Sequence, residues 1–361
     1  MPVGIDRGIS FIPQQHPRWQ DWKWQQQSAC TDLRTLQDWT QESGHQLDLD
    51  PELFKRLIQA YRMGVTPYYY SLIEQFNDKD PIFRQIIPTE AELILDDSDV
   101  DDPIGDESPG QGSRPMKALI HRYPNRVLLL PTSICSVYCR FCFRKRLVGD
   151  PHHNASQQDM EDAYTYIREH SEIEEVILTG GDPMTLGDHA LLTTLRTLAE
   201  ITHLRFIRIH TRLPVVNPYR LTTRLGLAIS QIHKPVWIST HFNHVREVTP
   251  VVEGYVADWT DIGISFLNQT VLLRGVNDSA ESLKALFLRL IELKIKPYYL
   301  HHADRVKGTS HLRTTIGEGL EILKKLQGNI PGYAMPHYVL DSPEGTGKIP
   351  LQNPYDPHHS S

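Results

Sequence analysis

Six short β-rich runs in the C-terminal two thirds of the chain are the feature that most limits its possible folds. They are VLLLP from Val127, EVILTG from Glu175, RFIRIHT from Arg205, PVWIST from Pro235, ISFLNQTVLL from Ile264 and IKPYYLHH from Ile295. After the first gap their starts lie about thirty residues apart, which is the length of a strand and a crossover helix. The pattern predicts an α/β fold of six parallel βα units, a partial (βα)6 barrel with active-site loops at the carboxyl ends of its strands.

The chain before these runs has a different character. Residues 1–110 are rich in Trp, Gln and acidic side chains, with helical periodicity over 29–42 and 51–62. The segment 96–113 is acidic and contains Gly, Pro and Ser, a composition that predicts an exposed connection. We therefore expect an N-terminal helical extension (1–110), a barrel core (111–330) and a C-terminal segment (331–361).

Charge and hydropathy argue against several classes of protein. The net charge of −7, with interspersed signs, predicts no broad basic face and hence no nucleic-acid partner. No run approaches the roughly 18 apolar residues that span a bilayer, and the start MPVGIDRGIS lacks a signal-peptide pattern. We expect a cytoplasmic protein without a membrane partner that acts on a small molecule.

Three of the four cysteines lie close together, in the string CSVYCRFC at 135–142. Cys135, Cys139 and Cys142 follow the first β-run, and three thiolates can bind three irons of a four-iron cluster while the fourth iron stays open. A zinc site is the alternative, but zinc needs four ligands and a second C-x2-C pair is absent from the sequence. The motif therefore indicates a [4Fe-4S] cluster, and Cys30 is expected to be a buried free thiol.

The spacing C-x3-C-x2-C, with Tyr138 before the second cysteine, resembles the cluster motif of the radical S-adenosylmethionine superfamily. This resemblance implies that the open iron binds S-adenosylmethionine. It also places Gly180, Gly181 and Asp182, in the string TGGDPMTL at 179–186, at the methionine amino group of that cofactor. Without the resemblance, GGDP could be an ordinary turn.

Five longer stretches resemble lysine 2,3-aminomutases, over nearly the whole chain. They are WQDWKWQ at 19–25, GVTPYYYSL at 64–72, HRYPNRVLLL at 121–130, THFNHVREVTP at 240–250 and NQTVLLRGVND at 268–278. The resemblance implies an isomerase that also uses pyridoxal 5′-phosphate. It identifies Lys348, in LDSPEGTGKIP at 340–350, as the lysine that binds pyridoxal phosphate. It assigns the phosphate to Arg122, Tyr123 and Arg126, since two guanidiniums and a hydroxyl suit a dianion.

The resemblance also assigns both ends of the substrate. Arg144, just past the cysteines, would bind the substrate carboxylate, while Asp304 and Asp341 would bind the distal ammonium of lysine. Without the resemblance, each aspartate could be a helix cap or a turn residue. Two acidic groups favour a cationic side chain, so the expected reaction is conversion of L-lysine to β-lysine.

Two further residues match family positions at the carboxylate of S-adenosylmethionine, namely His241 in THFNH and Gln269 in LNQT. The chain also departs from the family pattern. Ser279 and the C-terminus lack the cysteines that bind a structural zinc in clostridial members, so the homo-oligomeric state cannot be inherited from them. His301 stands where those members carry an aromatic side chain near the adenosine.

Three other functions stay open. One is the branch that forms (R)-β-lysine for translation elongation factor P, whose members have shorter N-termini. Another is an aminomutase for arginine or glutamate. The third is a non-catalytic iron–sulfur protein for electron transfer or redox sensing, which would leave Lys348 and Arg122 unexplained. An aminomutase would also need an electron donor such as flavodoxin or ferredoxin.

Overall fold

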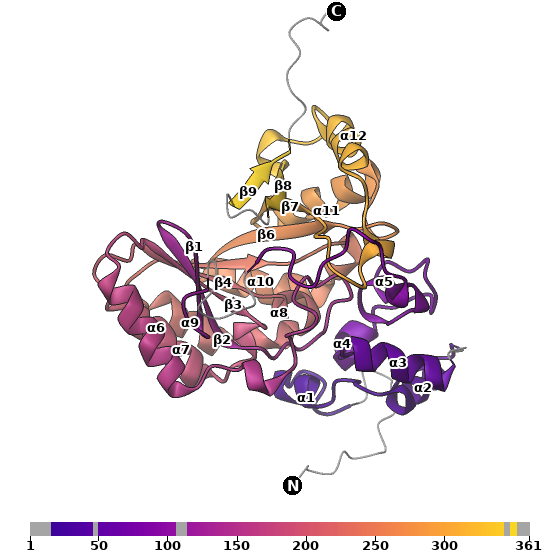
Figure 1. Ribbon diagram of the computed structural model, residues 1–361, viewed down its shortest axis with the longest axis horizontal. Helices are drawn as coiled ribbons and strands as arrows, with labels where there is room; N and C mark the ends of the chain where they lie inside the picture. Colours follow the sequence, from indigo (N-terminus) through magenta and orange to yellow (C-terminus); the bar gives the residue numbers. More distant parts are fainter. Residues whose placement is uncertain (1–15, 46–49, 106–113, 343–346, 352–361) are drawn as a thin grey trace, which may run out of the picture.

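The computed structural model describes residues 16–45, 50–105, 114–342 and 347–351. Its centre is a sheet of nine strands that follow one another in chain order, from β1 to β9 (Figure 1). The strands are β1 (Leu119–Tyr123), β2 (Arg126–Thr132), β3 (Glu175–Gly180), β4 (Phe206–His210), β5 (Val236–Thr240), β6 (Ser265–Leu272), β7 (Ile295–His302), β8 (His337–Ser342) and β9 (Gly347–Pro350).

Strands β2 to β8 run parallel to their neighbours, and β1 and β9 add antiparallel strands at the two edges. Parallel neighbours need a crossover, and most crossovers here contain a helix. The longer crossover helices are α6 (Gln157–Glu169), α7 (Asp188–Ala199), α9 (Thr223–Ser230), α10 (Pro250–Asp261), α11 (Ala280–Glu292) and α12 (Ile316–Leu326). The six predicted β-runs are β2 to β7, which confirms the predicted barrel-like α/β fold.

Three strands were absent from the sequence prediction. They are β1, β8 and β9, which are four to six residues long. Runs this short and this polar carry too little alternation to be distinguished from turns. They matter for function because they lie at the two edges of the sheet, where the predicted lysine and phosphate residues stand.

Alternation within the strands decides which side chains face the barrel interior. In β6, Phe266, Asn268, Thr270 and Leu272 are buried, and the residues between them are more exposed. Successive side chains of a strand point to opposite faces, so Gln269 faces the barrel interior while Phe266 packs in the hydrophobic core outside it. In α11, Leu283, Leu286, Phe287 and Leu290 form the matching buried helix face.

The N-terminal extension is helical over much of its described residues and lies along one side of the barrel (Figure 1). Its helices are α1 (Trp22–Gln27), α2 (Leu33–Glu42), α3 (Pro51–Ala60), α4 (Pro67–Tyr70) and α5 (Phe83–Ile86). Asp32 and Asp50 cap α2 and α3 by accepting backbone N–H groups. The hydroxyl of Thr66 donates to the carbonyl of Val216, 2.6 Å away, so the extension is bonded directly to the barrel.

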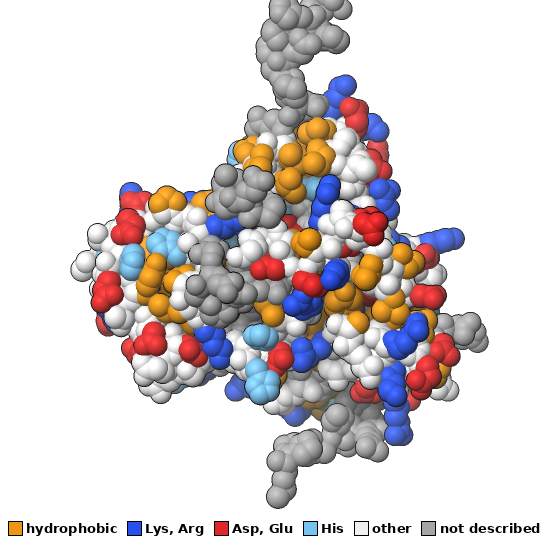
Figure 2. Space-filling view, viewed as in Figure 1, with side chains coloured by type: hydrophobic (Ala, Val, Ile, Leu, Met, Phe, Trp, Pro, Cys, Tyr) orange, Lys and Arg blue, Asp and Glu red, His pale blue; other side chains and the backbone are white. Residues whose placement is uncertain are grey.

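Shorter elements complete the fold. They are α8 (Leu213–Val216) and the 3-10 turns η2 (Glu90–Leu93), η3 (Pro151–His153), η4 (Pro183–Thr185), η5 (Pro218–Arg220), η6 (Val245–Glu247), η7 (Ser310–Leu312) and η8 (Gly332–Ala334). On the face drawn in Figure 2, basic and acidic side chains are interspersed. Among the described residues, no helix combines the length and the apolar character needed to cross a membrane.

The predicted connection 96–113 is only partly exposed. Residues 96–98 are exposed, as expected, but Asp99 is buried and pairs with Arg313. Ile104 is also buried and lines the central cavity. The prediction of an exposed segment is therefore wrong for Asp99, for Ile104 and for Pro103, which is also buried. Asp99 can be buried because a cation pairs with it, and the side chains of Pro103 and Ile104 are apolar. Residues 106–113 lie outside the described residues.

Candidate active site

One cavity of about 400 Å³ opens inside the barrel, mostly at the carboxyl ends of the strands. Every predicted site residue lines it: Cys135, Cys139, Cys142, Arg122, Tyr123, Arg126, Lys348, Gly180, Gly181, Asp182, His241, Gln269, Arg144, Asp304 and Asp341. The carboxyl ends of parallel strands meet at one edge of a sheet, which explains how residues after β2, β3, β5 and β7 share one space. Arg122, Tyr123, Arg126 and Lys348 reach it instead from the edge strands β1 and β9 and from the start of β2.

The three cysteines lie on an irregular loop after β2, and the N-terminal extension holds this loop. The backbone N–H of Tyr138 donates to the carbonyl of Gly64 at 2.9 Å, and that of Arg140 donates to the carbonyl of Gln85 at 2.8 Å. A Cβ atom at Gly64 would lie 2.8 Å from the Tyr138 ring. The cysteine loop therefore depends on close backbone contact with the extension.

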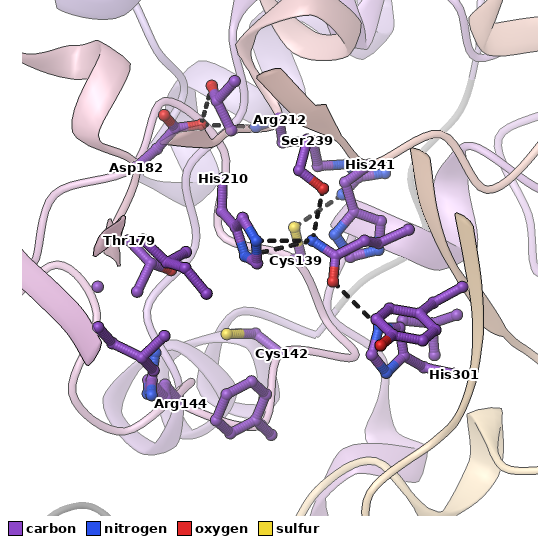
Figure 3. Close-up of a pocket in the computed structure, with 18 of the residues that line it drawn as sticks. Cys139, Cys142, Arg144, Thr179, Asp182, His210, Arg212, Ser239, His241 and His301 are labelled. Atoms are coloured by element: carbon purple, nitrogen blue, oxygen red, sulfur yellow. Dashed lines mark hydrogen bonds between the residues drawn. The ribbon is translucent and has the colours of Figure 1, made fainter. Parts of the chain in front are cut away.

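The thiols themselves suit a soft metal cluster. Burial raises the pKa of Cys135 well above its usual value and that of Cys142 to about 11, so metal binding must displace their protons. A guanidinium nitrogen of Arg212 donates to the sulfur of Cys139 at 2.7 Å (Figure 3). Within the described ranges, no three His, Cys, Asp or Glu side chains are arranged to hold a single metal ion. The fit of a cluster therefore rests on three thiolate ligands in one cavity.

Cys30 is separate from this group. It is buried in the N-terminal extension, and its backbone pairs with Val65. Burial raises the pKa of its thiol well above the usual value. The prediction of a buried free thiol is confirmed.

The end of β3 needs its two glycines. Gly180 has a φ of +111°, and a Cβ atom there would lie 2.7 Å from the carbonyl oxygen of Thr132. A Cβ atom at Gly181 would lie 2.4 Å from the backbone of Ser133. The N–H of Gly181 donates to the same Thr132 carbonyl at 2.7 Å. The glycines therefore let β3 approach the start of the cysteine loop.

Asp182 connects β3 to β4. Its carboxylate accepts hydrogen bonds from the hydroxyl of Thr211 at 2.9 Å and the backbone N–H of Arg212 at 2.7 Å. Burial raises the pKa of Asp182 to about 6, although these hydrogen bonds oppose the rise. Its side chain is therefore occupied by donors of the chain itself, which orient the loop after β4.

Polar side chains from β4 to β7 form a hydrogen-bonded row across the cavity (Figure 3). The amide nitrogen of Gln269 lies 3.2 Å from His210 Nδ1 and donates to Ser239 at 2.9 Å, while its oxygen lies 3.2 Å from His301 Nε2. Burial lowers the pKa of His210 and His301 well below the usual value. His241 Nε2 is buried and lacks a hydrogen-bond partner in the part of the chain that the structure describes. It therefore suits a ligand that supplies an oxygen or nitrogen atom.

Lys348 and the residues predicted to bind the phosphate of pyridoxal phosphate lie close together, where the edge strands β1 and β9 approach each other. Arg122 on β1 lies 3.6 Å from the Asp341 carboxylate on β8 and donates to the carbonyl of Ser342. The backbone N–H of Lys348 on β9 donates to the hydroxyl of Tyr123 at 2.9 Å. The Lys348 amine donates to Asp341 at 2.5 Å. These side-chain contacts bring the first and last strands together around the cavity.

The same residues suit an anionic pyridine cofactor. The Arg126 guanidinium stacks 3.8 Å from the centre of the Tyr123 ring. Arg122 Nε is buried and makes no hydrogen bond to any described residue. Gly347 has a φ of +83°, and a Cβ atom there would lie 2.4 Å from the Tyr123 ring. A primary amine and two guanidiniums thus face one cavity, as pyridoxal phosphate requires.

The predicted substrate residues carry opposite charges. Burial and the nearby Asp341 carboxylate raise the pKa of Asp304 to about 7, although Lys348, Arg122 and Arg144 oppose the rise. Arg144 follows the three cysteines closely in the sequence. Its side chain is buried and lines the same cavity as the cysteines (Figure 3). The cavity thus holds a pair of carboxylates and a cation that could bind two ends of one molecule.

Several residues that line the cavity were not predicted from the sequence. Arg208 on β4 pairs with Glu175 on β3 at 2.9 Å, and its guanidinium lies 5.8 Å from the Tyr298 ring. His210 and Arg212 follow on the same strand and the loop after it. The strand β4 itself was predicted from the sequence. Alternation of side chains along it would have indicated that Arg208 and His210 point to the same face.

Comparisons with known proteins agree with this geometry. Residues 129–247 match the family model described as the Radical SAM superfamily, so fold, cysteine loop and match define the chain as a radical S-adenosylmethionine enzyme. An L-lysine 2,3-aminomutase of Methanococcus maripaludis is 39% identical over 93% of this chain and 76% of its own length. An L-lysine 2,3-aminomutase of Fusobacterium nucleatum is 38% identical over 93% of this chain and 77% of its own length. A glutamate 2,3-aminomutase of Clostridioides difficile is 36% identical over 96% and 80%.

The chain belongs to the lysine 2,3-aminomutase family. It is a PLP-dependent isomerase of the amino acid 2,3-aminomutase type. Its cofactors are a [4Fe-4S] cluster, S-adenosylmethionine and pyridoxal 5′-phosphate.

Proposed function

We propose that this protein converts L-lysine to β-lysine by moving the α-amino group to the neighbouring carbon. The observation that carries the proposal is the pair of carboxylates Asp304 and Asp341 in the same cavity as Lys348 and Arg144. A substrate with an anionic end and a distant cationic end matches this distribution of charge. Glutamate would place a second carboxylate against two acidic residues, which like-charge repulsion disfavours.

Each cofactor has residues proposed to bind it. Cys135, Cys139 and Cys142 would hold the cluster, Gly180, Gly181, Asp182, His241 and Gln269 would hold S-adenosylmethionine, and Lys348, Arg122, Tyr123 and Arg126 would hold pyridoxal phosphate. When bound, these groups supply a carbon radical that can break an unactivated C–H bond and a π-system across which nitrogen can migrate.

The residues of the chain would position the substrate. Arg144 would bind its carboxylate, and ionised Asp304 its distal ammonium, which together fix the carbon that reacts. Asp341 accepts a hydrogen bond from the Lys348 amine at 2.5 Å. With Lys348 bonded to pyridoxal phosphate, its nitrogen would no longer pair with Asp341 as an ammonium. Asp341 would then be able to pair with the distal ammonium of lysine beside Asp304.

Anaerobic incubation of the reconstituted protein with L-lysine, S-adenosylmethionine and dithionite tests the proposal. The expected product is β-lysine, detected by chiral chromatography, with arginine, glutamate and alanine run in parallel. Conversion of glutamate but not lysine would contradict the proposed substrate. No cleavage of S-adenosylmethionine under reduction would contradict the radical reaction. The handedness of the product would test the branch that forms (R)-β-lysine.

We also propose an electron donor and a cellular compartment for the enzyme. A one-electron donor of low potential, such as flavodoxin or ferredoxin, would reduce the cluster, and the protein would work in the cytoplasm. We expect no nucleic-acid or membrane partner. Light scattering of the holoenzyme would establish whether it is a homo-oligomer.

A further inference from the structure

A buried guanidinium lies against the sulfur of one cluster cysteine. Arg212 is 7% exposed, and its Nη1 donates to Cys139 Sγ at 2.7 Å (Figure 3). The backbone N–H of Arg212 also donates to the Asp182 carboxylate at 2.7 Å. The residue that bonds the sulfur is therefore held at its backbone as well as at its side chain.

The second guanidinium nitrogen is held by three other groups. Nη2 of Arg212 donates to the hydroxyl of Tyr69 at 2.9 Å, to the Gln85 side-chain oxygen at 2.5 Å and to Glu247 at 2.9 Å. Glu247 is fully buried and also accepts the hydroxyl of Tyr69 and a backbone N–H of Asn243. The N-terminal extension and the loop after β5 thus fix the direction in which the guanidinium points.

Hydrogen bonds to cluster sulfurs and nearby charges influence the reduction potential of a cluster. One-electron reduction makes the cluster more negative by one charge, and no bond to the protein forms or breaks. A fixed cation that donates N–H to a ligand sulfur stabilises this added charge, and the effect is strong in a buried site with few mobile waters. The electron comes from dithionite or from a protein donor of low potential.

We propose that Arg212 is a positioning residue that raises the reduction potential of the cluster through its hydrogen bond to Cys139. The inference rests on the proposed function, because it needs the three cysteines to bind the cluster. It assigns a role to the buried network of Tyr69, Gln85 and Glu247, namely to hold the guanidinium on the sulfur.

The test is a redox titration of the anaerobically reconstituted full chain, followed by electron paramagnetic resonance. The double variant Arg212→Gln/Glu247→Gln removes the cation without leaving an unpaired buried carboxylate. A matched control is Arg220→Gln/Asp188→Asn. Arg220 is fully buried and pairs with Asp188 at 2.7 Å, but its other hydrogen bonds go to the carbonyls of Met184 and Leu186.

The Arg212 double variant is expected to bind as much iron and sulfide as the wild type. Its cluster is expected to have a more negative midpoint potential. The control is expected to keep the wild-type potential. An unchanged potential in the Arg212 double variant, or an equal shift in the control, would overturn the inference. If the double variant binds no cluster, the midpoint potential is measured in the single variant Arg212→Lys instead. One ammonium cannot replace all the bonds of the planar guanidinium, so we expect a smaller shift in the same direction.

Failure of the inference differs from failure of the proposed function. A wild-type protein that binds no cluster after reconstitution would contradict the proposed function itself. A wild-type cluster whose potential matches that of both Arg212 variants would contradict only the role of Arg212.

Discussion

Single side chains carry the chemistry at the edges of the sheet. The Lys348 side chain is 25% exposed, so its amine is reachable from the cavity while Asp341 holds it. Arg122 and Tyr123 approach the same segment from β1. A nucleophilic amine, a carboxylate and a cation within one contact network are suited to covalent binding of an aldehyde cofactor.

Replacing Lys348 with Ala is expected to abolish the visible absorption of pyridoxal phosphate bound to the protein. The cluster absorption should remain, because the cysteine loop follows β2 and does not contact β9 through the sheet. Lys307→Ala is the control, since Lys307 pairs with Asp101 outside the cavity lining. A pyridoxal band that survives in Lys348→Ala would show that the lysine is wrongly assigned.

The pH dependence of lysine binding should report Asp304. Its pKa is raised to about 7, so the free enzyme carries a neutral carboxyl below this pH and a carboxylate above it. The distal ammonium of lysine keeps its charge over this range. We therefore expect kcat/KM for lysine to rise as the pH increases through about 7. In Asp304→Asn this rise should disappear; an identical pH profile in both proteins would contradict the assignment.

The same raised pKa has a consequence for stability. Folded Asp304 retains a proton that the unfolded chain loses near its ordinary pKa of 3.8. Its contribution to the free energy of unfolding therefore falls as the pH rises from about 4 to about 7. Burial of this carboxyl group in the cavity, where it could bind a cation, therefore lowers the free energy of unfolding at neutral pH.

At the scale of elements, the end of β3 decides how closely the cysteine loop approaches the barrel. Two backbone hydrogen bonds hold the end of β3, one from Gly181 to Thr132 at the end of β2 at 2.7 Å and one from Asp182 to Ile134 in the cysteine loop at 2.8 Å. No side chain fits between the two segments at Gly181. The loop and the strand end therefore form one surface of the cavity.

Gly181→Ala is expected to destabilise the protein by at least about 1–3 kcal/mol, because its Cβ would overlap backbone atoms that cannot move aside easily. Iron binding should weaken as well. Gly254→Ala is the control, because a Cβ at this helical position meets nothing within 4 Å. It should be neutral or more stable by about 0.5–1 kcal/mol. Equal unfolding midpoints in urea for both variants would contradict this account.

At the scale of the molecule, buried charges join the N-terminal extension to the cysteine loop. Glu92 of the extension accepts hydrogen bonds from Arg140 Nε at 2.8 Å and from Lys145 at 2.9 Å. Lys145 also donates to the carbonyl of Gly308, in the loop after β7. Burial lowers the pKa of Lys145 to about 8, against the attraction of Glu92. Three distant parts of the chain therefore share one buried ion network.

Glu92→Gln leaves two buried cations without their carboxylate and should lower the free energy of unfolding by about 3–5 kcal/mol. The pKa of Lys145 is about 8 with Glu92 in place and should fall further without the attraction of Glu92. Lys145 would then lose its proton in the variant at a lower pH, so the loss of stability should shrink as the pH rises towards 8. Arg205→Gln, which breaks an exposed pair with Glu174, should change stability by less than about 1 kcal/mol. Similar losses in urea unfolding of both variants would contradict a central role for Glu92.

The same unfolding curves bear on the organisation of the chain. The division into 1–110, 111–330 and 331–361 stays a prediction. Separate unfolding transitions would support it, whereas a single transition that shifts in Glu92→Gln would indicate that extension and barrel unfold together.

The sequence alone was sufficient for the barrel strands β2 to β7 and for the cysteine motif. Both are local patterns: strand alternation repeats every two residues, and the three cysteines lie within eight. The short strands β1 and β9 escaped detection, since their stability comes from pairing with neighbours rather than from their own residues. The roles of the site residues came from the family resemblance, and the structure placed those residues in one cavity.

Only the tertiary structure decided which side chains meet across the cavity. Arg212 and Cys139 are 73 positions apart, and Lys348 and Tyr123 are 225 apart. Neither contact leaves a trace in local periodicity, because each depends on the order of the strands and on the closing of the sheet edges. The sequence by itself determined the βα repeat and the thiol spacing. The packing of the extension and the edges of the sheet determined the partners of the Cys139 sulfur and of Lys348.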